Sequence, residues 1–333
     1  MGKGRCCILF NQPREGALAD ELDVLDQVEF IEKHLKELGI ETYRKGITAS
    51  FMEEIAGLYK DKPDFVFNLV ESIDNKGELS YFIPALLNRY SLSYSGNPLE
   101  AIFTTTSKIL TSRMLKASGI NNPKAFLPSE HQLLITGNTY IVKPVWEDGS
   151  LGITEDSVFI YNKGVEERLK KLDDTHWFIE DFIDGREFNI SILAGEKGPE
   201  VLPPAEIVFK NYKENKPRIV DFKAKWEMES FEYENTVREF PGIEINQVLR
   251  EKLMSIALKC WNVFGLKGYA RVDMRIDAGE NPFVIEINAN PCISPDGGFV
   301  AATKQAGFQF NIVLQRILND LNNLQNGDRF KGY

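Results

Sequence analysis

The sequence predicts an α/β protein built from more than one packed unit. Three observations carry this prediction: the length of 333 residues, the alternation of strand-like and helix-like segments over the first hundred residues, and a β-hairpin pattern near residue 270. A chain of this length can hold two or three units, and an apolar content of 43% is ordinary for a globular protein. Alternating strands and helices are typical of a parallel sheet covered by helices.

The first hundred residues favour a small doubly wound α/β unit. Short apolar runs bounded by turn residues predict strands, and an amphipathic stripe that ends at Gly39 predicts the first helix. The predicted strands are Arg5–Phe10, Ile40–Tyr43, Asp64–Val70 and Ser91–Tyr94, and the predicted helices are Glu21–Leu38 and Leu79–Tyr90. The first strand lacks a following G-x-G-x-x-G turn, so the usual dinucleotide-binding fold is not indicated.

A second segment begins with a helix and a lysine-bearing strand. Ser107 caps a predicted helix that ends at Gly119 and has Lys108 in its first turn, where a lone lysine is most simply a surface residue. The strand 139–142 leads into Lys143 and the loop EDGSLG of residues 147–152. A glycine-containing loop can present backbone N–H groups to phosphate, although the acidic pair in this loop opposes anion binding.

The remaining elements lead to the hairpin near residue 270. We predict strands at His176–Phe182 and Arg186–Leu193, and helices at Glu251–Phe264 and Phe308–Leu324. Residues 209–242 are rich in charge and aromatic side chains with little periodicity. So long a stretch predicts a lid or a disordered loop, and it contains Lys223 and Lys225.

The hairpin pattern places polar side chains opposite one another. If residues 277–282 form its loop, Asp273 falls opposite Glu286 and Arg271 falls opposite Asn288. Two carboxylates facing each other across a ladder repel, so a cation is expected between them. Two carboxylates and an amide oxygen form an all-oxygen set that suits magnesium. The alternative is an ordinary amphipathic hairpin with solvated charges; the arginine and the sharp exit after Asn288 favour a metal–nucleotide site.

Composition excludes several classes of function. No run of about 18 apolar residues exists, so no membrane span is expected, and the N-terminal apolar run is too short for a secretory signal. The net charge of −10 argues against a general nucleic-acid binder. The four cysteines, Cys6, Cys7, Cys260 and Cys292, show no paired metal spacing, which indicates reduced thiols in a cytoplasmic protein.

The order of these signals resembles the ATP-grasp superfamily, and within it the D-alanine–D-alanine ligase family, from about residue 64 to about residue 315. The motifs that carry the resemblance are TTSKILTSRMLKASGI, YIVKP followed by EDGSLGI, FIEDFIDGREF, DFKAKW and the hairpin. The resemblance implies an ATP-grasp fold: an N-terminal doubly wound α/β domain plus two α+β subdomains that clamp ATP. The implied domains are 1–103, 104–187 and 188–333, the last with the metal site and the mobile loop 209–242.

The resemblance implies an ATP-dependent carboxylate–amine ligase. Such an enzyme forms an amide or peptide bond through an acyl phosphate and releases ADP and phosphate, with two Mg²⁺ ions, or Mn²⁺ in their place, as cofactor. The implied metal ligands are Asp273, Glu286 and Asn288; the implied catalytic residues are Arg271, Lys225 and Ser150; and the implied nucleotide contacts are Lys108, Lys143, Gly149, Ser150, Glu180, Phe182, Ile183, Glu187 and Lys225. Arg271 would stabilise the oxyanion formed when the amine attacks, and Lys225 the transferring phosphoryl group.

The chain departs from this family where substrates would be recognised. The region NLVESIDNKGELS lacks the family's histidine, and NQPREGALADELD has no clear counterpart of its N-terminal glutamate. Trp226 stands where the family has tyrosine, Gly149 where it has the first loop serine, and Cys292 where it has glycine. We read Cys292 as a packing residue rather than a nucleophile. These differences predict amino acid or peptide substrates other than a pair of D-alanines.

Two other functions use the same metal and lysine set. An ATP-grasp kinase would need a base beside its acceptor hydroxyl, and no motif supplies one. A non-catalytic ATP-binding module would be expected to lack a metal ligand or the late lysine, yet Lys225 is present. The expected partners are small carboxylate and amine molecules, neither nucleic acid nor membrane, and the resemblance implies a homodimer through the N-terminal domain.

Overall fold

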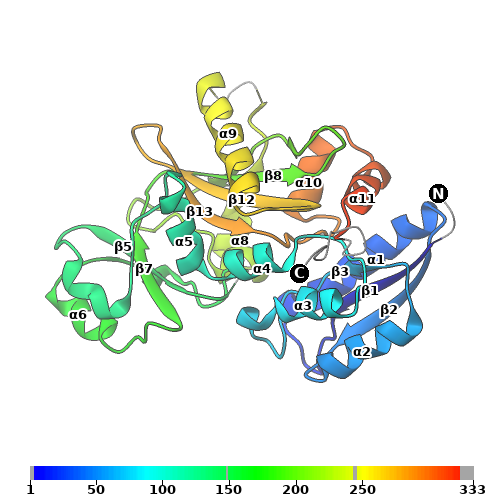
Figure 1. Ribbon diagram of the computed structural model, residues 1–333. Helices are drawn as coiled ribbons and strands as arrows, with labels where there is room; N and C mark the ends of the chain where they lie inside the picture. The colour runs from blue at the N-terminus through cyan, green and yellow to red at the C-terminus, as the bar shows by residue number, and fades with distance from the viewer. Residues whose placement is uncertain (1–3, 148, 243–245, 323–333) are drawn as a thin grey trace, which may run out of the picture.

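The computed structural model describes residues 4–147, 149–242 and 246–322, and its strands form three sheets (Figure 1). The sheet nearest the N-terminus is parallel, as the alternation of strands and helices predicts, and the other two are antiparallel. The α/β class expected from the sequence is confirmed. Each described helix is too short or too polar to cross a bilayer.

The N-terminal unit is doubly wound. Its strands are β1 (Arg5–Asn11), β2 (Glu41–Ile47) and β3 (Phe65–Asn68), in the order β2-β1-β3, and its helices are α1 (Ala19–Glu37), α2 (Phe51–Asp61) and α3 (Phe82–Arg89). Neighbouring residues of a strand point to opposite faces of the sheet. Cys6 therefore packs with the apolar stripe of α1, and Cys7 packs with α2 and α3.

Two details of this unit differ from the sequence prediction. Residues 91–94 do not form a strand, because Tyr94 makes only isolated bridges, to Val66 and to Asn322. The helix α2 was not predicted. Its buried apolar side chains are Ile55 and Leu58, a stripe too short to stand out in the sequence.

The central unit is a four-stranded antiparallel sheet with its own apolar core. Its strands, in the order β4-β7-β5-β6, are β4 (Ala125–Phe126), β7 (Trp177–Asp181), β5 (Thr139–Pro144) and β6 (Val158–Ile160), and its α-helix is α6 (Lys163–Leu169). Buried residues such as Tyr140, Leu169 and Ile179 fill the space between sheet and helix. Lys143 and Glu180 lie on the other side of these strands, where they face the C-terminal unit.

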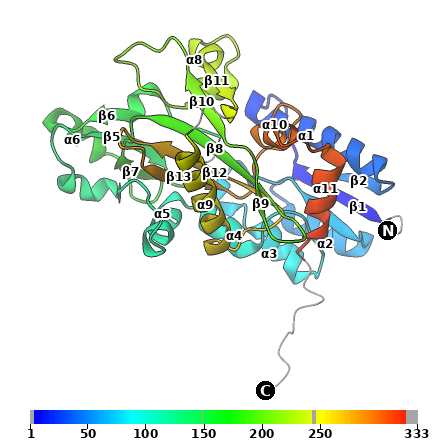
Figure 2. The ribbon, with the colours of Figure 1, turned by 90° about the horizontal axis from the view of Figure 1, so that it is seen from above.

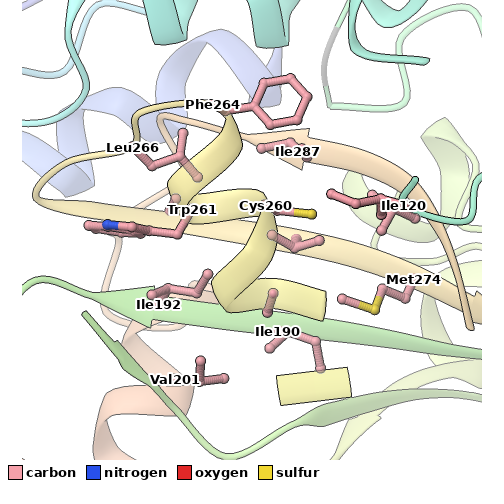
Figure 3. Close-up of a cluster of buried hydrophobic side chains, with 14 of the residues drawn as sticks. Ile120, Ile190, Ile192, Val201, Cys260, Trp261, Phe264, Leu266, Met274 and Ile287 are labelled. Carbon is pink, nitrogen blue, oxygen red and sulfur yellow. The ribbon is translucent and has the colours of Figure 1, made fainter. Parts of the chain in front are cut away.

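The C-terminal sheet supplies the largest core. Its path is β11 (Thr236–Glu239), β10 (Ala205–Phe209), β8 (Arg186–Leu193), β12 (Tyr269–Ile276) and β13 (Pro282–Asn288), with β9 (Glu200–Val201) paired to β8. One face is covered by α9 (Gln247–Val263), α4 (Leu99–Thr106) and α5 (Lys108–Ala117). Figure 3 shows Cys260 and Trp261 of α9 above Ile190 and Ile192 of β8. The opposite face of this sheet lines the cavity described below.

The hairpin β12–β13 has the predicted facing pairs but a different turn. Asp273 lies opposite Glu286, and Arg271 lies opposite Asn288, as the sequence predicts. The connection is residues 277–281, one residue shorter than predicted. A β-bulge at Ile285 takes up the difference and restores the register.

The bulge also changes which side chains of β13 enter the core. Val284 and Ile287 are buried, with 1% and 2% of their surface exposed. Strict alternation predicts Phe283 and Ile285 beside Ile287, and that prediction is wrong, since both remain partly exposed. Ile285 instead faces the cavity beside Glu286.

The 209–242 segment is more ordered than its sequence suggests. It contains α7 (Phe222–Trp226), α8 (Phe231–Asn235) and β11. Side chains cap both helices: Asp221 accepts from the amide of Ala224, and Ser230 accepts from that of Tyr233. The expectation of a stretch without secondary structure is therefore wrong. Its mobility stays a prediction.

The last helices join the C-terminal unit to the N-terminal one (Figure 2). They are α10 (Gly298–Gln305) and α11 (Phe310–Asn319). Phe310 packs on Phe30 of α1, with ring centroids 4.4 Å apart, and Asn311 bonds to His34. α11 is shorter than the predicted helix 308–324, of which residues 323 and 324 lie outside the described residues.

Candidate active site

A cavity of about 1160 Å³ separates the C-terminal sheet from the central sheet and reaches the N-terminal unit. Of the sequence-predicted site residues, those that line it are Lys143, Gly149, Ser150, Glu180, Phe182, Ile183, Glu187, Lys225, Arg271, Asp273, Glu286 and Asn288. Lys108 lies at the start of α5 and reaches Glu286 from the side. The structure thus brings every predicted site residue to one place.

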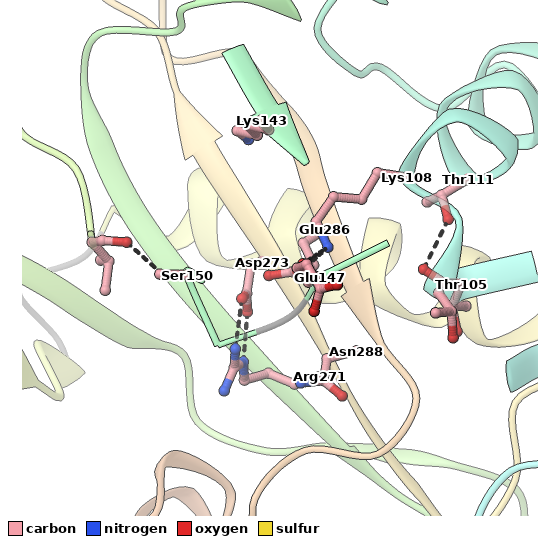
Figure 4. Close-up of polar contacts among 12 residues, drawn as sticks. Thr105, Lys108, Thr111, Lys143, Glu147, Ser150, Arg271, Asp273, Glu286 and Asn288 are labelled. Atoms are coloured by element: carbon pink, nitrogen blue, oxygen red, sulfur yellow. Dashed lines mark hydrogen bonds and ion pairs between the residues drawn. The ribbon is translucent and has the colours of Figure 1, made fainter. Parts of the chain in front are cut away.

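Two ion pairs occupy the middle of the hairpin (Figure 4). Arg271 donates two hydrogen bonds to Asp273, Nε to Oδ1 at 2.7 Å and Nη2 to Oδ2 at 2.8 Å. Lys108 Nζ lies 3.1 Å from Oε1 of Glu286 and donates to the carbonyl of Glu147 at 2.7 Å. Each of the two facing carboxylates therefore has a cation beside it, which offsets their mutual repulsion.

Burial and charge shift the acid–base behaviour of this centre. Burial alone would raise the pKa of Glu286, but the positive charges of Lys108, Lys225 and Arg271 together hold that pKa below its ordinary value. Burial raises the pKa of Asp273, and Arg271 only partly offsets that shift. The pKa of Lys225 is lowered, first by burial and then by the Arg271 guanidinium.

The donor set of the hairpin fits a hard divalent cation. Asp273 and Glu286 face each other, and Asn288 lies on the same side of β13, where its Oδ1 accepts from the amide of Asn290 at 2.8 Å. The described residues contain no cluster of three His, Cys, Asp or Glu side chains that could hold a metal. Two carboxylates supplemented by an amide oxygen and phosphate oxygens are the ligands that Mg²⁺ takes in nucleotide sites.

A second group of charges in the cavity comes from the central sheet. Lys143 of β5 forms an ion pair with Glu180 of β7, and both side chains are nearly buried. The sheet places them together because residues 141 and 180 pair across the ladder, with Lys143 two residues further along β5. A lysine and a carboxylate beside apolar Phe182 and Ile183 form a suitable pocket for a polar heterocycle and its phosphates.

Arg275 joins Glu187 of β8 to the segment after β7, and sequence reasoning missed it. Its Nε and Nη2 donate to Oε2 of Glu187 at 3.0 and 2.9 Å, and its Nη1 donates to the carbonyl of Ile183 at 2.9 Å. Its guanidinium lies 5.2 Å from the ring centroid of Phe182. The period-two pattern that selected Arg271 and Asp273 also places Arg275 on their face, so the signal was present.

The glycine loop is held against α7. Ser150 has a left-handed backbone conformation, with φ of 65°, and its hydroxyl donates to the carbonyl of Val220 at 2.6 Å. Trp226 Nε1 donates to the carbonyl of Gly149 at 3.0 Å. These contacts place the loop beside the helix that holds Lys225.

Cys292 lies on the N-terminal side of the cavity. Its thiol donates to Oδ2 of Asp23 at 3.1 Å, and its sulfur lies 2.9 Å from the hydroxyl of Ser294. Burial raises the pKa of Cys292, and the nearby carboxylate of Asp23 raises it further. The thiol form is therefore favoured, which suits a packing residue better than a nucleophile.

Comparison with known proteins gives this arrangement a family. A family model described as D-ala D-ala ligase C-terminus matches residues 113–319. The D-alanine–D-alanine ligase of Aquifex aeolicus (strain VF5) is 28% identical over 293 residues, which cover 86% of this chain and 92% of that protein.

Solved structures share the whole architecture. That of D-alanine–D-alanine ligase from Bacillus anthracis superposes with a TM-score of 0.72 at 18% identity, covering 95% of this chain and 97% of that one. The VanG D-Ala:D-Ser ligase from Enterococcus faecalis gives a TM-score of 0.71 at 16% identity, over 95% and 99% of the two chains. The match of the family model to most of the chain, together with these folds, shows that the chain belongs to the D-Ala–D-Ala ligase family and has the ATP-grasp fold.

Proposed function

We propose that this protein is an ATP-dependent carboxylate–amine ligase that joins amino acids or small peptides. The observation that carries the proposal is the meeting of Lys108, Lys225 and Arg271 around the facing carboxylates Asp273 and Glu286. A centre with three cations and two acids suits a reaction in which negative charge moves between phosphate and carbonyl oxygens. In such reactions, catalysis comes mainly from positioning and electrostatic stabilisation.

The proposed first step joins the carboxylate substrate to the γ-phosphate of ATP. A carboxylate oxygen attacks phosphorus, the bond to the bridging oxygen breaks, and ADP leaves. Lys143 and Lys108 would hold the phosphates, and Lys225 would neutralise the transferring group. Asp273, Glu286 and Asn288 would hold Mg²⁺, which supplies charge neutralisation at the phosphate oxygens when it is bound.

The proposed second step forms the amide bond. The amine nitrogen attacks the carbonyl carbon of the acyl phosphate, a tetrahedral oxyanion forms, and phosphate leaves while the amine loses a proton. Arg271 is the side chain proposed to stabilise that oxyanion. Its double hydrogen bond to Asp273 fixes the guanidinium plane, so little orientation is left to arrange during the reaction.

The residues around the substrate end support substrates other than two D-alanines. Trp226 and Gly149 contact each other directly, at positions where the resembling family has tyrosine and serine. Cys292 bonds to Asp23 of α1, on the wall formed by the N-terminal unit. These exchanges alter the size and hydrogen bonding of the substrate end, while the residues proposed for nucleotide and metal remain together.

The test is an assay with purified protein, Mg²⁺, ATP and pooled amino acids and dipeptides. Phosphate release is followed while mass spectrometry searches for products. A product one water lighter than the sum of two pool members, formed only with ATP, supports an amide ligase and identifies both substrates. A phosphorylated pool member would instead support a kinase, and bound ATP without any turnover on a widened pool would support a binding module.

A further inference from the structure

The cavity extends over the carboxyl ends of the parallel strands β1, β2 and β3. The residues that line it there are 11–14 at the end of β1, 47–49 at the end of β2 and 70–72 after β3. The sheet order β2-β1-β3 puts the crevice at which the chain changes direction between β1 and β3. Ligands of open parallel sheets bind outside the strand ends at such a crevice. The nucleotide, metal and catalytic assignments use none of these residues.

The end of β3 lies beside the proposed reaction centre, and β2 is the strand farthest from it. Asn290, two residues after the proposed metal ligand Asn288, donates to the carbonyl of Val70 at 3.3 Å. From β3, the sheet continues through β1 to β2, and neighbouring strands are about 4.8 Å apart. The cavity therefore reaches roughly 10 Å beyond β3, a distance that an extended chain covers with about three residues.

Hydrogen bonds within the protein hold the strand ends in place. Asn11 joins the end of β1 to the segment after β3, because its Nδ2 donates to the carbonyl of Ser72 at 2.6 Å and its Oδ1 accepts from the amide of Glu71 at 2.8 Å. After β2, the amide and the hydroxyl of Thr48 both donate to the carboxylate of Glu54 at 2.8 Å. A wall that is formed before a ligand arrives reduces the entropy lost on binding.

The charge of this wall favours a cationic ligand group. Among the described residues of the N-terminal unit, those that line the cavity include one guanidinium, that of Arg14, and four carboxylates, those of Glu21, Asp23, Glu71 and Asp74. Arg14 forms an ion pair with Asp74. Glu21 and Asp23 accept hydrogen bonds from neutral side chains, which leave their charge in place. An acidic wall attracts an ammonium group and repels a carboxylate.

We propose that this extension binds the amino-terminal part of a peptide whose carboxyl-terminal carboxylate enters the reaction. The inference rests on the proposed ligase function and deepens it, since it names the carboxylate substrate as a peptide of about three residues. A peptide that reacts through its carboxylate has an ammonium at its far end, which suits the acidic wall. A peptide that reacts through its amine would bring a carboxylate there instead.

The experiment measures how affinity depends on peptide length. Alanine, dialanine, trialanine and tetraalanine, with either configuration at the carboxyl-terminal residue, are titrated by calorimetry in the presence of Mg²⁺ and a non-hydrolysable ATP analogue. Each compound is compared with its carboxyl-terminal amide and with its N-acetylated form. Turnover of the same panel is followed in parallel with Mg²⁺-ATP.

Two variants of the wild-type protein separate the subsite from its surroundings. Ala49→Trp places a large side chain in the cavity at the end of β2, and Ala49 is exposed, so the fold should tolerate the change. Met52→Trp is the matched control. Met52 is exposed at the start of α2, close to Ala49 in sequence, and does not line the cavity.

We expect the Kd of the wild-type protein to fall on the order of tenfold from alanine to trialanine, with little further change for tetraalanine. Ala49→Trp should remove this gain without changing the Kd of alanine or of the nucleotide, and Met52→Trp should retain it. The amides should show no gain with length, because they lack the carboxylate that anchors the reacting end. N-acetylation should remove part of the gain, because the ammonium is lost.

The two proposals fail in different ways. A gain with length that Ala49→Trp removes, without condensation of any panel member, contradicts the ligase and leaves the subsite standing. Condensation with equal Kd for alanine and trialanine, or a gain that persists in Ala49→Trp, overturns the subsite and leaves the ligase standing. An equal gain for the amides overturns the assignment to the carboxylate substrate. Absence of binding by every peptide also overturns the subsite.

Discussion

Arg275 ties three parts of the site together through one guanidinium. It is 4% exposed and bonds to Glu187 of β8, to the carbonyl of Ile183 after β7, and to the carbonyl of Arg218 in the 209–242 segment. One side chain thus links the central sheet, the C-terminal sheet and the segment above them. The position of the nucleotide pocket depends on it, although it carries no proposed chemistry.

Replacing Arg275 alone should lower the free energy of unfolding more than replacing both Arg275 and Glu187. Arg275→Met leaves Glu187 buried with an uncompensated charge, so we expect the free energy of unfolding to fall by about 3–5 kcal/mol. Adding Glu187→Leu should recover part of that loss, because the stranded charge is then gone. Urea unfolding of the single and double variants measures both effects. A double variant as unstable as the sum of the two single variants would contradict this account of the pair.

Glu286 is a proposed metal ligand, and its ion pair with Lys108 also bears on the stability of the fold. Glu286→Gln should abolish ATP turnover while the circular dichroism spectrum stays that of the wild type, because the amide keeps the shape but loses the charge. Glu239→Gln, which changes an exposed strand carboxylate paired with Lys210, is the control and should retain turnover. Full activity of Glu286→Gln would remove Glu286 from the proposed metal site.

Glu286 should also make stability depend on pH in one direction. Its folded-state pKa lies below the ordinary value of 4.5, so its ionised form is favoured by folding. This contribution is fully present above about pH 4.5 and is lost as the pH falls toward the depressed folded-state pKa. The difference in unfolding free energy between wild type and Glu286→Gln should therefore shrink as the pH is lowered below 4.5. A constant difference would show that Lys108, Lys225 and Arg271 together do not favour the ionised form of Glu286 in the folded state.

The residues found in advance differ in their local pattern from Arg238, a second cavity residue that sequence reasoning missed besides Arg275. Asp273 and Glu286 were found because strand periodicity and a short turn fix which residues face each other. Arg238 lies on a four-residue edge strand that follows α8 directly, and its contacts come from residues 296 and 298. Only the tertiary fold joins these, so no local pattern could place it.

At the level of the elements, the β-bulge in β13 keeps Asp273 opposite Glu286, as the candidate site requires. The turn is one residue shorter than the sequence pattern suggested, and without compensation Glu286 would lose its place opposite Asp273. The extra residue, Ile285, restores the pairing and adds an apolar side chain to the cavity. The facing pairs could be predicted from the sequence. The bulge that produces them could not, because a bulge depends on the twist of the whole sheet.

The 209–242 segment is fastened by Lys216. Its Nζ lies 2.8 Å from Oε2 of Glu155, which follows the glycine loop, and 2.8 Å from Oε1 of Glu232 on α8. The first ion pair joins the segment to the central unit, and the second ties Lys216 to α8 within the segment. Lys216 and Glu232 are mostly shielded from water, whereas Glu155 is 56% exposed; the shared lysine makes this a network rather than an isolated surface pair.

Lys216→Ala should release the segment. We expect limited proteolysis within residues 209–242 to become several times faster without nucleotide, and a magnesium nucleotide to restore much of the protection. Lys170→Ala is the matched control, since Lys170 also bridges two glutamates, Glu166 and Glu167, but on the exposed helix α6. Equal cleavage of the two variants would show that Lys216 does not hold the segment.

At the level of the whole molecule, the packed cores do not follow the three predicted domains. The core around β1 and α1 also contains Leu193, Tyr269 and Phe299 from the C-terminal unit, and the core under α9 contains Ala101 and Ile102 from α4. Two cores draw on no other unit: that of the central sheet, and that between the N-terminal sheet and helices α2 and α3. The boundaries at residues 103 and 187 stay predictions about sequence organisation; long-range packing of this kind leaves no local sequence signal.

Native-state hydrogen exchange should reveal two cooperative units rather than three. Amides of β5 and β7 should exchange through an opening of the central unit that leaves β1 and β12 protected, because its core is separate. A magnesium nucleotide analogue should slow that opening, since the proposed phosphate contact Lys143 lies on β5. The prediction fails if β1 exchanges independently of β12, or if β5 and β7 open only with the whole molecule.

The contact between α1 and α11 has a consequence for the synthesis of the chain. The apolar stripe of α1, with Val28, Ile31 and Leu35 fully buried, is completed by Val313, Leu314 and Ile317 of a helix that begins at Phe310. At the usual speed of a ribosome, roughly 15–60 s pass between the appearance of the two helices. Throughout that interval the nascent N-terminal unit has an uncovered apolar face, which is the surface a holding chaperone recognises. Translation speed and chaperone supply should therefore govern the yield of this protein more than its final stability does.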